Sequence, residues 1–365
     1  MKVECVKNKL YNLLQKTERV TGKNQNLPIL SCFLLSAEGG VLTVHATNLD
    51  LGVKSSTLVR VLKEGKVVVP ASVFFGFLSQ LTNDENVSLE SVGGVLEVST
   101  KHTKTSIKLF DSKDFPNIPI SNNTTQNIIP TKDLLKGLQS VWFSASVSAM
   151  KPELSSVCIY YDQKNLVFVA TDSFRLAEKK VATKPLDIQP ILIPFKNVVD
   201  IIKILDGHEG NISVSSSKGQ VSFLGEGVYI VSRVIEGSFP DYQQIIPKEF
   251  KTEVVLLKQD LISSLKLSNI FSNTFNQINF FLSPSKKTFE LNTQNEHVGK
   301  SVVKVDAVVK GEELNVDFNH RYLTDCFQPI SSDSISLRFS GAHKPLVLQG
   351  VGDTSFIYLV MPMNK

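Results

Sequence analysis

The chain has 365 residues, which is enough for two or three domains that each bury a core. Hydrophobic residues make up 42% of the sequence and charged residues 20%, as in ordinary globular proteins, and the net charge of +4 is too small to argue alone for a nucleic-acid partner. The first five residues lack the apolar core of a signal peptide, and no apolar run approaches the length of a membrane span.

The first third of the chain is predicted to combine helices with antiparallel strands. Apolar residues recur at helical spacing over 6–20, and a second helix is predicted over 71–81. Short runs rich in Val, Leu and Thr between turn residues predict a meander. The stretch 27–30 is expected to lead into a strand, and further strands are expected near 41–46, 86–90, 95–100 and 105–110. The polar stretch 121–126 is typical of a linker.

The rest of the chain continues the same alternation. A helix is predicted to begin at Thr131, a suitable N-cap with an acid in the first turn. Further helices are expected over 194–206, 258–271 and 319–330. The strands are expected near 154–161, 165–171, 174–182, 276–283, 287–293 and 298–309, with a last strand in the segment 356–365. Sheets with helices packed on them indicate an α+β fold.

Short patterns recur along the chain at one spacing. Pro70 and Pro194 each open a predicted helix and lie 124 residues apart, and a looser copy of this motif begins 125 residues later at Asn319. The stretches 46–49 and 170–173, both beginning Ala-Thr, are also 124 apart. A shared spacing across unrelated patterns predicts three copies of one domain. We expect these domains at 1–120, 127–247 and 248–365.

Motifs for catalysis or metal binding are not evident in the sequence. The six histidines share no motif, no spacing suits a metal, and no cofactor is expected. Asp172 and Arg175 are interpreted as a pair that braces a turn, and no catalytic residue is assigned. Four scattered cysteines predict neither a metal site nor a disulfide framework, and buried thiols in a reducing cytoplasm are expected.

Five stretches together resemble the bacterial sliding clamp family, the β subunit of DNA polymerase III. They are 27–30 (Leu-Pro-Ile-Leu), 115–117 (Phe-Pro-Asn), 170–177, 239–242 (Phe-Pro-Asp-Tyr) and 360–363 (Val-Met-Pro-Met). The resemblance covers essentially the whole chain. It implies the DNA clamp fold, with three repeated domains, each with two helices packed on antiparallel sheets, forming half of a closed ring.

The resemblance also implies the function and partners of a processivity factor, which is not an enzyme. A homodimeric ring would enclose double-stranded DNA without regard to sequence, with the basic faces of its helices toward the channel. The replicative polymerase, the clamp loader and repair proteins would dock through short apolar peptides. The expected DNA-facing residues are Lys9, Lys16, Arg19, Lys23, Asn24, Lys132, Lys136, Lys151, Lys196, Lys203, Lys266 and Arg321.

Two further sets of residues follow from the resemblance. The peptide-binding pocket would comprise Leu154, Thr171, Ser173, Phe174, Arg175, Leu176, Pro240, Gln244, Ile245, Phe275, His343, Pro345, Leu346, Leu359, Val360, Met361, Pro362 and Met363. The dimer interface would join Ile107 and Leu109 to Ile270 and Phe271, although these residues also suit a strand or helix core.

The sequence departs from the family pattern at several of these positions. Ser173-Phe174 stands where Gly-His is common, Gln244 and Asn24 stand where basic residues are common, and the chain ends in Asn364-Lys365 where Arg-Leu is common. Two other functions share the repeat. One is a triplicated enzyme with its site at a domain seam, and the other is a monomeric interaction scaffold without a DNA role.

Overall fold

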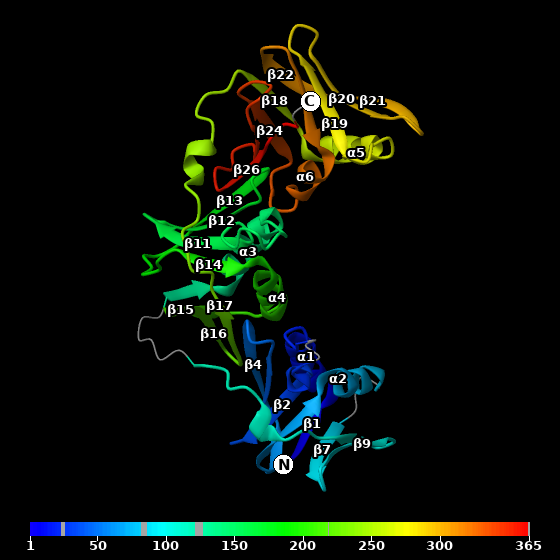
Figure 1. The fold of residues 1–365 in the computed structure, drawn as a ribbon, viewed down its shortest axis with the longest axis vertical. Helices are drawn as coiled ribbons and strands as arrows, with labels where there is room; N and C mark the ends of the chain where they lie inside the picture. Colours follow the sequence, from blue (N-terminus) through cyan, green and yellow to red (C-terminus); the bar gives the residue numbers. More distant parts are fainter. Residues whose placement is uncertain (23–25, 82–85, 121–126, 218, 364–365) are drawn as a thin grey trace. The chain divides into compact units, whose positions relative to one another are not determined.

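The computed structural model describes residues 1–22, 26–81, 86–120, 127–217 and 219–363 (Figure 1). The chain forms two compact units. Unit 1 contains Met1–Lys132 and Lys196–Val234, and unit 2 contains Asp133–Phe195 and Ile235–Lys365. The domain boundaries expected from the sequence remain predictions.

Unit 1 is built on two antiparallel sheets. In the described part of the unit, the larger sheet has the order β10 (Asn127–Pro130), β15 (Asn211–Ser217), β16 (Gln220–Gly225), β17 (Val228–Arg233), β4 (Leu51–Leu58), β3 (Val41–Thr47), β2 (Cys32–Glu38) and β6 (Gly65–Pro70). The smaller sheet has the order β5 (Arg60–Lys63), β1 (Lys2–Val6), β7 (Asn86–Val92), β8 (Val95–Ser99) and β9 (Lys104–Lys108).

Unit 2 repeats this plan. Over its described residues, the larger sheet has the order β14 (Ile191–Pro194), β11 (Ser156–Asp162), β12 (Asn165–Thr171), β13 (Arg175–Ala182), β26 (Phe356–Val360), β25 (Leu346–Gly350), β24 (Ser334–Phe339), β18 (Thr252–Leu257) and β22 (Ala307–Gly311). The smaller sheet has the order β21 (Gly299–Val305), β20 (Thr288–Asn295), β19 (Gln277–Ser283) and β23 (Leu314–Asn319).

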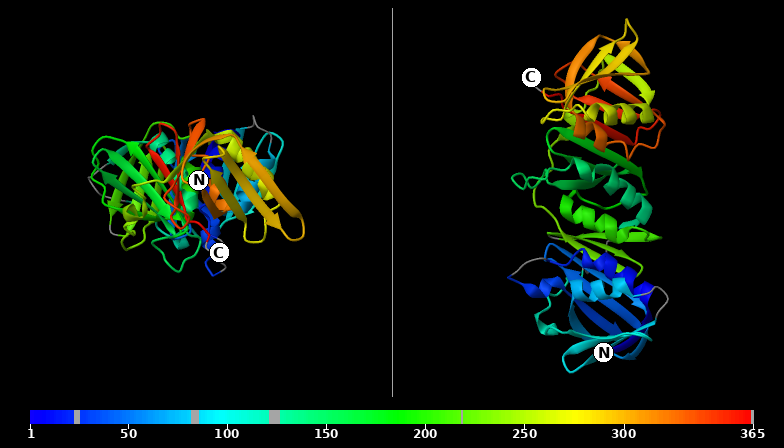
Figure 2. Two further views of the ribbon diagram at one scale, coloured as in Figure 1. Left: turned by 90° about the horizontal axis from the view of Figure 1, so that it is seen from above. Right: turned by 90° about the vertical axis from the view of Figure 1, so that its right-hand side faces the viewer.

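The helices lie against these sheets with their apolar stripes buried, as their spacing predicts. They are α1 (Lys7–Glu18), α2 (Ala71–Gln80), α3 (Thr131–Val141), α4 (Phe195–Leu205), α5 (Lys258–Asn269) and α6 (His320–Asp325). In unit 1, α1 and α2 lie side by side (Figure 2), and the rings of Tyr11 and Phe75 stack with centroids 5.2 Å apart. The α+β class expected from the sequence is confirmed.

The internal repeat is visible in two hairpin turns 124 residues apart. In the turn between β3 and β4, the Thr47 hydroxyl donates to the Leu51 carbonyl, 3.0 Å away, and accepts from the Leu49 amide. In the turn between β12 and β13, the Thr171 hydroxyl donates to the Arg175 carbonyl, 2.7 Å away, and accepts from the Ser173 amide. Leu49 and Ser173 both adopt φ of 77°. The two turns therefore have the same construction.

Several sequence-based expectations about the elements were wrong. The helix expected over 319–330 ends at Asp325, because Pro329 follows closely and disfavours helical geometry before it. The segment 27–30 does lead into a strand as expected, passing through the 3₁₀ turn η1 (Pro28–Ser31) to β2. The long strand expected over 298–309 divides into β21 and β22 at Asp306. The short strands β1 and β10 before α1 and α3 were not anticipated.

No helix among the residues that the structure describes is both long enough and apolar enough to span a membrane.

Candidate functional site

The turn between β12 and β13 is held in one conformation by its own side chains. The Asp172 carboxylate accepts from the amides of Phe174 and Arg175, each at 2.9 Å. Ser173 occupies the left-handed region that favours glycine, which is a local strain of about 1–2 kcal/mol. The turn presents Phe174 outward, with 60% of its surface exposed. A large apolar side chain is thus fixed at the surface.

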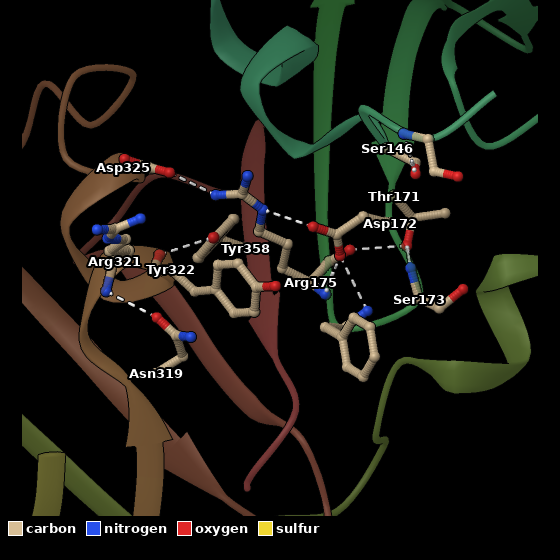
Figure 3. Close-up of polar contacts among 12 residues, drawn as sticks. Ser146, Thr171, Asp172, Ser173, Arg175, Asn319, Arg321, Tyr322, Asp325 and Tyr358 are labelled. Carbon is tan, nitrogen blue, oxygen red and sulfur yellow. Dashed lines mark hydrogen bonds and ion pairs between the residues drawn. The ribbon is translucent and has the colours of Figure 1, made fainter. Parts of the chain in front are cut away.

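Arg175 connects this turn to α6 of the same unit (Figure 3). Its Nε donates to Asp172 Oδ2 at 3.0 Å, and its Nη1 donates to Asp325 Oδ2 at 2.5 Å. The guanidinium lies over the Tyr322 ring, 4.6 Å from its centroid. Burial lowers the pKa of Arg175, but Tyr358 and the two carboxylates outweigh burial and raise the pKa above its usual value. Arg175 is therefore a cation held in place between the carboxylates of Asp172 and Asp325.

A second buried group holds the turn that begins at Tyr242. The Tyr242 hydroxyl donates to the buried Glu178 carboxylate of β13, and it lies 2.7 Å from the Tyr160 hydroxyl. Burial, and then the neighbouring Glu178, raise the pKa of Tyr242 well above its usual value. Tyr242 begins the 3₁₀ turn η4 (Tyr242–Ile245), so this contact fixes the position of Ile245.

The C-terminal strand completes the site. β26 pairs with β13 so that Leu359 lies opposite Leu176 and Val360 lies opposite Arg175. Beyond the strand, the Met361 amide donates to the Phe174 carbonyl at 2.8 Å, and the Met363 amide donates to the Asp317 carbonyl at 2.8 Å. The described part of the tail is therefore held by the backbone and does not fray.

These elements enclose a small apolar depression, which we call the tail hollow. Its volume is about 40 Å³, and it is lined by Thr171, Ser173, Phe174, Arg175, Leu176, Ile245, Leu359 and Met361. Phe174 and Ile245 are exposed beside it. Exposed apolar side chains around a hollow are typical of a surface that binds another molecule. All eight lining residues belong to the pocket expected from the sequence.

The remaining predicted pocket residues are placed differently. Leu154, Pro345, Leu346 and Val360 are buried, whereas Pro240, Gln244 and His343 are exposed and Pro362 is half-buried. Phe275 lines a separate hollow together with Asn273 and Gln277, so the structure does not bring it to the tail hollow. The Gln244 amide donates to Asp241 at 2.6 Å and is engaged within its own turn.

The basic residues expected to face DNA are mostly exposed. Lys9 and Arg19 project from α1, and Lys16 donates to the Asp206 carbonyl at 3.0 Å, just beyond α4. Burial raises the pKa of Asp200 on α4, while Lys203 and Arg19 oppose this, so both cations lie near that carboxylate. Lys132, Lys136, Lys151, Lys196, Lys203, Lys266 and Arg321 are exposed, and Lys151 lies in a loop. Lys23, Asn24, Asn364 and Lys365 lie outside the described residues.

The four residues expected at a dimer interface divide into two groups. Ile107 is buried within unit 1 and Leu109 is half-buried on the same side of the smaller sheet. Ile270 is exposed just after α5, and Phe271 is half-buried. Ile107 therefore belongs to the core of its own sheet, and the interface role of all four residues stays a prediction.

Metal and redox chemistry have no evident centre in the residues described. No cluster of three or more His, Cys, Asp or Glu side chains is found among them. The four cysteines are free and buried, and burial raises the pKa of the Cys5 and Cys158 thiols to about 12. A thiol with such a high pKa is a poor nucleophile at neutral pH.

Three family models match the chain in succession. The N-terminal domain of the DNA polymerase III beta subunit matches residues 1–119, the central domain matches 128–241 and the C-terminal domain matches 243–364. The chain belongs to the DNA polymerase III beta subunit family. The three matched domains account for the repeat found in the sequence and in the two hairpin turns.

Curated members of this family resemble the chain over its full length. The beta sliding clamp of Synechococcus elongatus is 28% identical over 372 residues, covering 100% of this chain and 99% of the relative. The beta sliding clamp of Bacillus subtilis is 25% identical over 382 residues and covers 100% of each.

Solved structures of the family share the fold. The DNA polymerase III beta subunit of Thermotoga maritima superposes with a TM-score of 0.93 at 25% identity, covering 100% of this chain and 99% of that one. The sliding clamp of Pseudomonas aeruginosa bound to griselimycin gives a TM-score of 0.95 at 21% identity, with 100% of both chains covered.

Sequence reasoning missed three residues that shape the site. Asp325 and Tyr322 of α6 hold Arg175, and Glu178 holds Tyr242. Asp325 lies 150 residues from its partner, so no local spacing connects them. The Asp172–Arg175 pair, in contrast, braces the turn as expected, with a 3.0 Å contact.

Proposed function

We propose that this chain is a DNA sliding clamp, a non-catalytic processivity factor that works in the cytoplasm as a ring of two copies. The ring encloses duplex DNA irrespective of sequence. It holds the replicative polymerase, the clamp loader and repair proteins through short apolar peptides that bind at the tail hollow. Membership in the DNA polymerase III beta subunit family supports this function.

The observation that carries the ring is the arrangement of the sheets. In unit 1, β17 pairs with β4, and in unit 2, β26 pairs with β13. Each larger sheet therefore joins strands from two copies of the repeat. One end strand of each smaller sheet is β9 or β21, and neither strand has a partner on its outer side among the described residues. Because β9 corresponds to β17 and β26, and β21 corresponds to β4 and β13, these two edges are complementary halves of one sheet.

The repeat also defines the register of that missing pairing. Thr47 lies opposite Gly52 in one hairpin and Thr293 lies opposite Ser301 in another, so Ser301 corresponds to Gly52. Gly52 pairs with Val231 of β17. Because β17 corresponds to β9 with a shift of 125 residues, Val231 corresponds to Ser106. Ser106 of one copy should therefore lie opposite Ser301 of the next.

A disulfide cross-link tests this arrangement. Directly opposed residues in an antiparallel pair have Cα atoms about 4.5–5.5 Å apart, which suits a disulfide. The Ser106→Cys/Ser301→Cys variant should become a covalent dimer on mild oxidation, while each single variant should not. The native cysteines are buried and should not interfere. A double variant that remains monomeric under denaturing conditions would contradict the ring.

Retention on DNA tests the function itself. Phosphate contacts from exposed lysines are independent of sequence, so a ring held by topology can slide without dense cationic contacts. Clamps loaded onto closed-circular DNA should remain bound, and cutting the circle should release them. If the protein dissociates equally from circular and cut DNA, the ring function is excluded and a scaffold without a DNA role remains.

The tail hollow suits weak, exchangeable docking. Each apolar anchor of a peptide contributes about 1.5–3 kcal/mol when buried. Two or three anchors, less an association cost of several kcal/mol, give a dissociation constant near the micromolar range. Ile245→Asp places a charge on an exposed residue of the hollow and should abolish binding of a polymerase C-terminal peptide without affecting folding. Unchanged affinity would exclude the hollow as the docking site.

A further inference from the structure

Unit 1 contains a hollow at the position that corresponds to the tail hollow. We call it the Leu49 hollow. Its volume is about 250 Å³, and it is lined by Thr47, Leu49, Asp50, Gly52, Pro116, Asn117, Ile118, Pro119, Gln220, Val231 and Arg233. All of these residues belong to unit 1. The Leu49 hollow is larger than the tail hollow, whose volume is about 40 Å³.

The two hollows are built from the same elements of the repeat. Thr47, Leu49 and Asp50 correspond to Thr171, Ser173 and Phe174, each 124 residues later. The segment 116–119 of the Leu49 hollow begins at the proline of the first Phe-Pro pair, and Ile245 of the tail hollow lies five residues after the proline of the second pair.

Backbone contacts confirm this correspondence independently of the side chains. The Arg233 amide donates to the Asp50 carbonyl at 2.8 Å, just as the Met361 amide donates to the Phe174 carbonyl at 2.8 Å. Val231 lies opposite Gly52, as Leu359 lies opposite Leu176. The Leu49 hollow is therefore the same cradle, with different side chains.

The floor of the Leu49 hollow is apolar. Val231 and Ile118 are buried, and Leu49 has 47% of its surface exposed. Gly52 lets Ile118 and Val231 pack directly against the backbone of the floor, because a Cβ atom at this position would lie 3.0 Å from Ile118 and 3.2 Å from Val231. One apolar side chain of a ligand could pack against these three residues.

The rim of the Leu49 hollow is polar. Arg233 and Asp50 approach each other to 3.7 Å, and their side chains are 66% and 64% exposed. An exposed pair of this kind is weak, so the Arg233 guanidinium remains available to a stronger partner. A guanidinium binds a carboxylate through two parallel hydrogen bonds, which gives it a preference for an acidic ligand.

We propose that the Leu49 hollow is a second peptide-docking site, which takes a short protein segment with one apolar side chain and an adjacent acidic residue. This proposal rests on the proposed function, because it assumes that the corresponding tail hollow of unit 2 binds peptides. The two sites differ in chemistry. The tail hollow presents Phe174 and Met361 where the Leu49 hollow presents Asp50 and Arg233, so both can take an apolar side chain but only the Leu49 hollow favours an acidic residue beside it.

Two isoleucines allow the sites to be observed separately. Ile118 lines the Leu49 hollow and Ile245 lines the tail hollow, so their methyl NMR signals report on each site in the full-length protein. The probe is an acetylated, amidated hexapeptide containing two leucines and one aspartate, and its control has lysine in place of aspartate. The aspartate peptide should shift both signals, and the lysine peptide should bind the Leu49 hollow at least fivefold more weakly.

Variants assign the binding to named side chains. Leu49→Asn removes the exposed apolar group, and asparagine tolerates the positive φ at this position, so the fold should be kept. This variant should weaken the response of Ile118 at least fivefold and leave that of Ile245 unchanged. Arg233→Glu should abolish the preference for the aspartate peptide. Ile245→Asp should leave the response of Ile118 intact.

The outcomes separate this proposal from the function of the tail hollow. If Ile245 responds and Ile118 does not, the second site is wrong while the first stands. If Ile118 responds equally to both peptides, or if Leu49→Asn changes nothing, the assignment of the ligand or of the hollow is wrong. If neither isoleucine responds, both docking sites are refuted.

Discussion

Arg175 should be the largest single contributor to stability at the tail hollow. Its side chain is 12% exposed and binds Asp172, which is 14% exposed, and Asp325, which is 42% exposed. Arg175→Met keeps the volume of the stem but leaves the Asp172 carboxylate largely buried without its cation. Breaking a buried pair in this way costs about 3–5 kcal/mol of the free energy of unfolding.

Asp325→Asn should lower the free energy of unfolding much less than Arg175→Met. The carboxylate is nearly half exposed, and exposed ion pairs contribute about 0.2–1 kcal/mol. The asparagine oxygen can still accept from Arg175. Because the benefit of Asp325 passes through Arg175, the double variant should be no less stable than Arg175→Met alone, which gives a coupling of about 1 kcal/mol.

The assay is urea unfolding followed by the fluorescence of Trp142, the one tryptophan in the sequence. Trp142 lies in η3 (Trp142–Ser144) beside Phe143, whose ring centroid lies 5.9 Å from the Arg175 guanidinium. The signal therefore reports on the surroundings of the hollow. A loss of 3 kcal/mol in Asp325→Asn, or strictly additive effects in the double variant, would refute this reasoning.

Three further predictions concern the backbone and one half-buried histidine. Ser173→Gly should raise the free energy of unfolding, measured with urea, by about 1 kcal/mol, because glycine relieves the positive φ. Gly137→Ala should lower the melting temperature measured by circular dichroism, since its Cβ would lie 2.1 Å from the Phe168 ring, whereas Gly76→Ala, with nothing within 4 Å, should raise it. Burial, together with neighbouring lysines, lowers the pKa of His45 from 6.5 to about 4, so the unfolded chain binds a proton more readily. Stability should be complete above pH 6.5 and fall by about 2–3 kcal/mol as the pH drops to 4, and His45→Gln should remove this dependence.

The sequence predicts the fold well where periodicity is long. Apolar stripes at helical spacing predict α1 to α5, and the 124-residue spacing predicts the repeated turns. Elements of four or five residues, such as β1 and β10, carry too few alternating positions to stand out. The C-terminal end of α6 was misjudged because apolar residues such as Phe327 continue past Asp325, although Pro329 prevents the helix from continuing.

The candidate site was only partly predictable. The residues around the tail hollow lie in short motifs that resemble the family, so eight of them could be named in advance. Arg175 pairs with Asp325 across 150 residues, and this contact depends on the tertiary fold. Phe275 lines a different hollow, so its role in the pocket stays a prediction. The Leu49 hollow depends on contacts between segments far apart in the sequence, such as the Arg233 amide with the Asp50 carbonyl.

The free edges of the two smaller sheets carry positively charged side chains. Lys104 and Lys108 are exposed on β9, and Lys300 and Lys304 are exposed on β21. Lysines on an edge strand repel a second cationic edge and discourage indiscriminate strand addition. The lysines thus guard an unpaired chain against aggregation, and in the proposed ring they would oppose pairing of β9 with β21 until salt or a polyanion neutralises them.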